Sequence, residues 1–107
     1  MTVPGSGDVV LNTVARYSAW IINRIGQFLR DNCPGAAYVF VWEHQKRGAL
    51  HAHYLLGSPD AKELMVIQKH WRNWCATIWD QLSVLSGCDL WQRSDGGSWA
   101  NDRDVLQ

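Results

Sequence analysis

The chain has 107 residues, with ten basic and ten acidic side chains and no formal net charge. This length suits a single modest core, so we expect residues 1–107 to form one domain. The charge balance argues against a strong nonspecific nucleic-acid binder, although it is compatible with a local basic face. The three cysteines lack framework spacing and predict a reduced, cytoplasmic protein. No apolar run approaches the length of a membrane span.

The first expected elements are a fragment of edge strand at residues 2–3 and a helix over residues 8–30. Asp8 suits the N-cap of this helix, and the Pro-Gly pair at residues 34–35 lies beyond its end. Apolar residues recur at steps of three and four, which is the spacing of one buried helix face. They are Val10, Val14, Tyr17, Ile21, Ile25 and Phe28.

Residues 38–57 predict a β-hairpin whose second strand carries two histidines. Successive side chains on a strand point to opposite faces, so His51 and His53 project from the same face. Two neighbouring imidazoles form half of a metal site. The facing strand is expected to supply the remaining protein ligand, and the hairpin register decides which residue that is.

A three-residue loop that ends in Gly48 places Glu43 opposite His51. A two-residue turn at residues 47–48 would instead place His44 opposite His51, because a slip of one residue moves every side chain to the other face. We prefer Glu43, since a loop with glycine last makes better use of Gly48.

One carboxylate and two histidines suit a divalent cation that also contacts substrate, and we expect magnesium or manganese at Glu43, His51 and His53. Structural zinc is disfavoured because the cysteines are distant and show no paired spacing. The alternative is that the histidines are half-buried and hydrogen-bonded while Glu43 is merely solvated. The combination of a histidine pair, a facing carboxylate and a glycine turn favours the metal.

After the hairpin, Ser58 is expected to cap a helix that runs to Ser86, with Gly87 as its stop. Its expected buried positions are Leu64, Ile67, Trp71, Trp74, Ile78, Leu82 and Leu85. Residues 88–92 are expected to form a short final strand. The order is therefore βαββαβ, which predicts an α+β fold of the ferredoxin-like plait type, an antiparallel sheet with two helices on one face.

Seven tryptophans are unusual in a chain of this size. We expect Trp71 and Trp74 in the core, because large aromatic residues mostly fill cores. Trp42, Trp91 and Trp99 are the ones expected to contact DNA or another protein.

Residues 43–53, EHQKRGALHAH, resemble the metal-binding motif of the HUH endonucleases, in which two histidines flank one hydrophobic residue. The resemblance is greatest to the rolling-circle replication initiators of phages and plasmids. It implies a nuclease for single-stranded or hairpin DNA, in which the metal polarises the scissile phosphate and a tyrosine on a later helix attacks it. It also implies that His51 and His53 are metal ligands and that Glu43 is the third.

The chain departs from that family in two places. No tyrosine follows Tyr54, and the early strand with threonines is reduced to residues 2–4, so the resemblance implies a domain shortened at both ends. Tyr17 follows Arg16, a cation that favours a phenolate, but it lies on an apolar helix stripe and is expected in the core. We therefore assign no catalytic residue.

The leading expectation is a metal-dependent domain that nicks or processes single-stranded DNA. The alternative is a phage-encoded, non-catalytic binding or inhibitor module derived from the same fold, acting on DNA, on a protein partner or as a homodimer. A third interpretation is an unrelated small α/β protein whose His-x-His is structural. None of the three requires a membrane.

Overall fold

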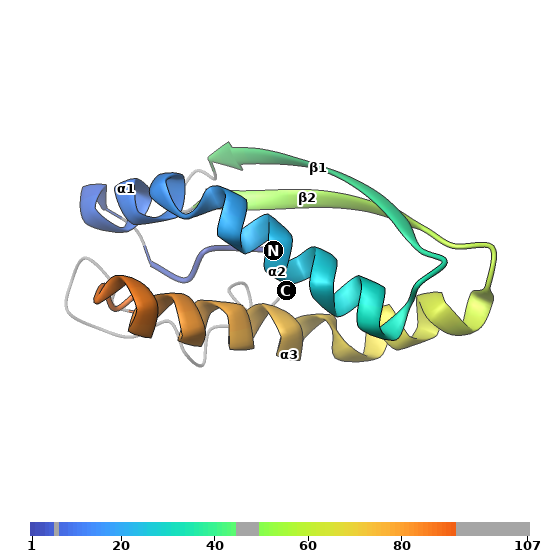
Figure 1. Ribbon diagram of the computed structural model, residues 1–107. Coiled ribbons are helices and arrows are strands. Elements are labelled where there is room, and N and C mark those ends of the chain that lie inside the picture. The colour runs from blue at the N-terminus through green and yellow to red at the C-terminus, as the bar shows by residue number, and fades with distance from the viewer. Residues whose placement is uncertain (6, 45–49, 92–107) are drawn as a thin grey trace.

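The computed structural model describes residues 1–5, 7–44 and 50–91 and has a mixed α+β architecture (Figure 1). The strands pair as an antiparallel hairpin, and helices α2 and α3 pack beside each other along it. The elements in chain order are α1 (Asp8–Arg16), α2 (Ser18–Asn32), β1 (Ala37–His44), β2 (Leu50–Gly57) and α3 (Ala61–Ser86).

The start of the chain pairs with the edge of β2 that β1 leaves open. Ala52 N donates to Met1 O (2.8 Å), Met1 N donates to Ala52 O (3.0 Å), and Val3 N donates to Leu50 O (2.9 Å). These bonds form an antiparallel ladder and confirm the expected fragment of edge strand. As a result, β2 lies between β1 and residues 1–3.

The register of the hairpin confirms the arrangement that the glycine loop predicts. Glu43 pairs with His51, whereas His44 pairs with Leu50. The loop itself, residues 45–49, lies outside the described residues.

The helix expected over residues 8–30 differs from the structure in two respects. Gly7 is the N-cap in place of Asp8, which is the first helical residue and makes no side-chain capping hydrogen bond. Tyr17 also separates α1 from α2. Its ψ of 15° departs from helical geometry. Hydrogen bonding nevertheless continues across the junction, since Tyr17 N donates to Thr13 O and Ile21 N donates to Tyr17 O, both at 3.0 Å. The backbone therefore leaves helical geometry at Tyr17 with little loss of hydrogen bonding.

The start of α3 also differs from the expected one, because Asp60 replaces Ser58 as the N-cap. Asp60 Oδ1 accepts from Lys62 N (2.9 Å), while Ser58 Oγ accepts from Asp60 N (3.1 Å) and donates to Glu63 Oε1 (2.6 Å). Ser58 thus supports the cap from two positions before it. The predicted end is confirmed, since Gly87 follows the helix with a φ of 70°, a conformation that glycine adopts readily.

The final strand expected at residues 88–92 is wrong over residues 88–91, which form no strand and end in a turn at residues 90–91. Leu90 N donates to Ser83 Oγ (3.1 Å) and Trp91 N donates to Asp89 Oδ1 (3.0 Å). These amides bond to nearby side chains instead of to a neighbouring strand. The last position of the expected strand lies outside the described residues.

The core lies between the hairpin and the helices. Among the positions of α3 expected to be buried, Ile67, Ile78 and Leu82 are buried, whereas Trp71 is only half-buried. Trp74 is buried as predicted, and Cys75 and Trp79 are buried too. Leu64 and Leu85 remain 39% and 54% exposed because they lie near the ends of α3, beyond the core. All three cysteines are free thiols. Among the described helices, none is long and apolar enough to span a membrane.

Candidate metal site

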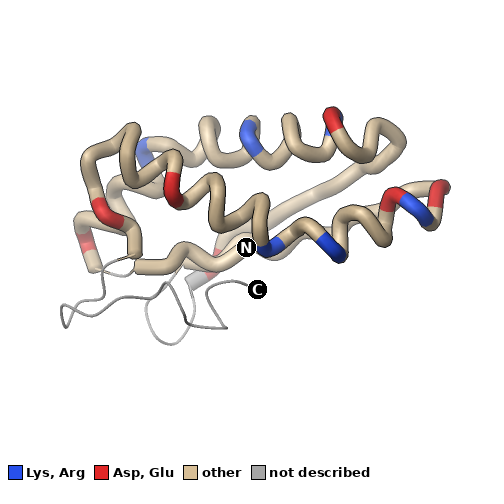
Figure 2. The backbone as a smooth tube through the Cα atoms, turned by 90° about the horizontal axis from the view of Figure 1, so that it is seen from below, with Lys and Arg blue, Asp and Glu red and all other residues tan. Residues whose placement is uncertain are grey.

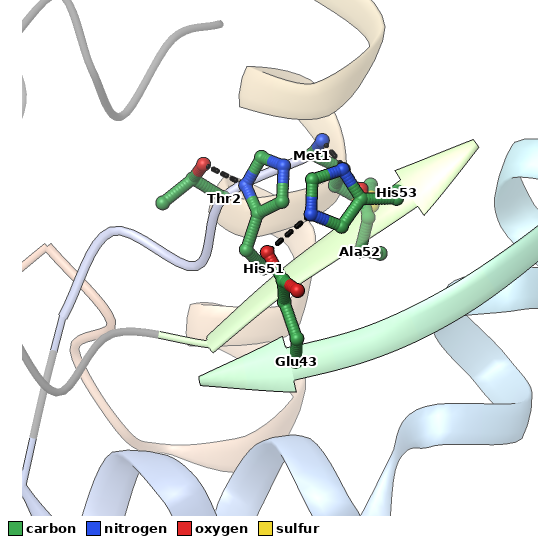
Figure 3. Close-up of polar contacts among 6 residues, drawn as sticks. All are labelled: Met1, Thr2, Glu43, His51, Ala52 and His53. Carbon is green, nitrogen blue, oxygen red and sulfur yellow. Dashed lines mark hydrogen bonds and ion pairs between the residues drawn. The ribbon is translucent and has the colours of Figure 1, made fainter. Parts of the chain in front are cut away.

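The predicted metal ligands lie on one face of the sheet, in a row that crosses from strand to strand (Figure 3). His51 in β2 has Glu43 of β1 opposite it on one side and Thr2 on the other. His53 lies two residues farther along β2, on the same face. The structure therefore brings together Glu43, His51 and His53.

The pairing pattern explains why Thr2 reaches His51. Met1 and Ala52 exchange two backbone hydrogen bonds, so the next pair, Thr2 and His51, is of the non-hydrogen-bonded kind. In such pairs the Cα atoms are about 4.5 Å apart instead of about 5.5 Å, and the side chains are closer. The Thr2 hydroxyl accordingly lies 2.5 Å from His51 Nδ1, and Thr2 is itself buried.

His53, in contrast, is hydrogen-bonded to the Glu43 carboxylate. Glu43 Oε1 and His53 Nε2 are in hydrogen-bond contact, across a diagonal of the antiparallel pair. The centroids of the His51 and His53 rings are 4.4 Å apart. The side chains of His53 and Glu43 are 54% and 52% exposed, so this pair is open to solvent and to a ligand.

The face that carries this row, which we call the outer face, is the side of the sheet away from the helices. Val39, Val41 and Leu55 project from it and are 60–73% exposed. The opposite face packs on the helices. Ala52 is fully buried there, and the rings of Tyr54 and Trp71 of α3 are in contact, with their centroids 5.2 Å apart.

Two of the tryptophans expected to contact a ligand, Trp42 and Trp91, are not at this row. Trp42 lies on the helix-facing side, where it lines a pocket with Ala19 and Ile22 of α2. The indole Nε1 of Trp91 donates to Asp80 Oδ1 (2.9 Å). Trp99 lies outside the described residues.

None of the three tyrosines presents its hydroxyl on the outer face beside the histidines. Tyr38 and Tyr54 project from the helix-facing side, and the buried Tyr54 hydroxyl has no hydrogen-bond partner among the described residues. Burial raises the pKa of Tyr54, which disfavours the nucleophilic phenolate. Tyr17 packs against the core, where the apolar stripe predicts it.

The donor types at the row suit a divalent cation, but they are not arranged as a finished site. In the described part of the chain, no three His, Cys, Asp or Glu side chains form a group that could hold a metal ion without rearrangement. Glu43 contacts His53, so an ion would have to replace that hydrogen bond. Two imidazoles and a carboxylate on adjacent strands nevertheless supply the appropriate ligands after a side-chain rotation.

Thr2 is the residue of this site that sequence reasoning missed. Metal-binding histidines usually donate their second ring N–H to a neighbouring acceptor, which fixes the tautomer and the ring orientation. With the proton on Nδ1, His51 donates to Thr2 Oγ1 and carries its lone pair on Nε2, the atom that would bind a metal. If a metal binds His51 Nε2, Thr2 is therefore a positioning residue for that ligand.

Replacing Thr2 with valine removes the hydroxyl but keeps the shape of a buried, strand-forming side chain. We expect Mn²⁺ affinity to fall about 10–100-fold, the range typical of such outer-shell changes. Isothermal titration calorimetry with Mn²⁺ measures this, and Thr2→Ser, which retains a hydroxyl, should stay within about threefold of wild type. Equal affinities for the valine and serine variants would contradict the positioning role.

Comparisons with protein-family models, with curated proteins and with solved structures found no match to this chain.

Proposed function

We propose that this chain is a metal-dependent domain that processes single-stranded DNA, of the HUH replication-initiator type. The observation that supports it most is the placement of Glu43, His51 and His53 on one exposed sheet face, with Glu43 in contact with His53. A magnesium or manganese ion held there would polarise a phosphate ester. The protein side chains would bind and orient this ion on an open face that a DNA strand can reach.

We also propose that the fold is a ferredoxin-like plait. Three features support this: β2 lies between β1 and residues 1–3, all neighbouring segments are antiparallel, and the helices lie on one face. A plait has a fourth strand beside the first. Among the described residues, no strand occupies that position.

A nicking reaction needs a nucleophile as well as a metal. The resemblance implies a tyrosine, but Tyr38 and Tyr54 project from the wrong face and Tyr17 is packed against the core. We therefore assign the three site residues to metal binding and leave the catalytic role unassigned.

The position of the tyrosines favours a second candidate, a non-catalytic module that binds DNA or a protein through the same sheet. Such a module keeps the metal and the exposed face and needs no nucleophile. It predicts stoichiometric binding without a covalent product, whereas the leading proposal predicts strand cleavage.

The two are separated by incubating the protein with Mn²⁺ and an end-labelled single-stranded DNA, followed by a denaturing gel. A shortened strand or a protein–DNA adduct that requires Mn²⁺ supports the nicking domain. Retention of the intact strand with saturable Mn²⁺ binding supports the binding module. A protein that binds no Mn²⁺ contradicts both, and the histidine pair would then be structural.

The register of the hairpin predicts which of two neighbouring side chains, Glu43 or His44, contributes to Mn²⁺ binding. Glu43→Ala should weaken Mn²⁺ binding about tenfold or more, because it removes a ligand, whereas His44→Ala should change it by less than about threefold, because residue 44 pairs with Leu50 on the alternate face. Isothermal titration calorimetry with Mn²⁺ on the two single variants shows which of them binds the ion more weakly. A larger effect of His44→Ala would contradict Glu43 as the third ligand.

A further inference from the structure

A groove lies at the edge of β2 opposite β1, between this strand and the middle of α3. Its volume is about 750 Å³, within the range typical of ligand sites. The residues that bear on its chemistry are Met1, His51, His53, Lys69, Trp71 and Arg72. Since both histidines of the candidate metal site line it, a molecule in this groove would lie directly beside that site.

Among the described residues that line the groove, the charged side chains are all basic. Lys69 and Arg72 lie three residues apart on α3 and therefore share one face of the helix. They are the only charged residues of α3 between Glu63 and Asp80, and the N-terminus of the chain lies beside this stretch (Figure 2).

Neither cation is neutralised by a neighbour in the part of the chain that the structure describes. Within the described residues, no carboxylate lines the groove and no ion pair involves Lys69 or Arg72. In a chain with no net charge, this is a local concentration of positive charge beside the histidines. Such a groove attracts anions and raises their local concentration.

We propose that this groove binds the phosphodiester backbone of a single-stranded nucleic acid, with Lys69 and Arg72 contacting successive phosphates. The inference rests on the proposed function, because it leads the strand past His51 and His53. It adds the path of the strand and the residues that hold it. These two cations act in binding and orientation and not as metal ligands.

The lining favours a single strand over a duplex. Trp71 is a half-buried aromatic residue in the same groove as the two cations. Basic grooves with aromatic side chains are typical of single-strand sites, where unpaired bases stack on the rings while cations follow the backbone. A duplex keeps its base faces stacked inside and cannot make this contact.

The test is fluorescence anisotropy with a labelled thymidine oligomer of about 12 nucleotides, in EDTA so that metal binding plays no part. The double variant Lys69→Gln, Arg72→Gln should bind about tenfold or more weakly. The slope of log affinity against log salt should also become shallower by about 0.7 for each lost phosphate contact. The matched control Arg16→Gln, Arg30→Gln removes the same charge from exposed positions on α1 and α2 and should change affinity by less than about twofold.

Equal losses in the two double variants would overturn the proposal, because net charge alone would then explain binding. Absence of binding by the wild type, or equally tight binding of a duplex of the same sequence, would overturn it as well. Mn²⁺ titration of the same variants keeps the two ideas separate. Loss of oligomer binding with Mn²⁺ affinity unchanged supports the groove, whereas a wild type that binds the oligomer but no Mn²⁺ contradicts only the proposed metal-dependent function.

Discussion

The double variant His51→Ala, His53→Ala should lose Mn²⁺ binding by more than about 100-fold, beyond the range typical of outer-shell changes. The reason is that it removes both nitrogen ligands and leaves Glu43 alone on an exposed strand, where a single carboxylate holds a divalent ion weakly. Isothermal titration calorimetry with Mn²⁺ measures the loss. Circular dichroism of the same sample checks that the helices remain.

The matched control is His70→Ala, which removes a histidine from α3. His70 stacks on Trp74 with ring centroids 6.1 Å apart and is not part of the row on the outer face. Mn²⁺ affinity should therefore stay within about threefold of wild type. An unchanged affinity in the double variant would contradict the metal site, and a comparable loss in His70→Ala would mean that Mn²⁺ binds elsewhere.

The largest expected effect on stability comes from Trp79. Its side chain is fully buried in α3, and truncation to alanine should lower the free energy of unfolding by about 3–5 kcal/mol. The indole Nε1 has no hydrogen-bond partner among the described residues, so Trp79→Phe removes an unsatisfied donor while keeping an aromatic ring. The phenylalanine variant should consequently lose far less stability than the alanine variant.

Urea denaturation followed by circular dichroism measures both variants. Val84→Ala, at a position 86% exposed on the same helix, should change stability by less than about 0.5 kcal/mol. If Trp79→Phe proved as destabilising as Trp79→Ala, the indole N–H would have to make a stabilising contact that its burial without a partner does not suggest.

The local parts of this fold were predictable because short-range rules determine them. The position of Gly48 in the sequence and the alternation of side chains along the two strands predict the register that pairs Glu43 with His51. A left-handed glycine ends α3 at Gly87. Both features depend on residues that lie close in sequence to the turn or the helix end that they determine.

The parts that sequence reasoning missed depend on long-range contacts. Nothing near Thr2 indicates that its hydroxyl bonds a histidine 49 residues away. The turn at residues 90–91 takes the place of a strand, since the Ser83 and Asp89 side chains accept hydrogen bonds from the amides of Leu90 and Trp91. The junction at Tyr17 carries no proline or glycine and leaves the helical periodicity of the sequence uninterrupted.

The short pairing of residues 1–3 with β2 gives the two histidines different conformational freedom. His51 lies where β2 has a neighbour on both sides, and its ring is already oriented by Thr2. His53 lies just beyond that pairing and is more than half exposed. Ligand binding would therefore cost side-chain conformational entropy mainly at His53 and Glu43. His51 would serve as the preorganised ligand, while the other two adapt to the ion and to whatever it carries.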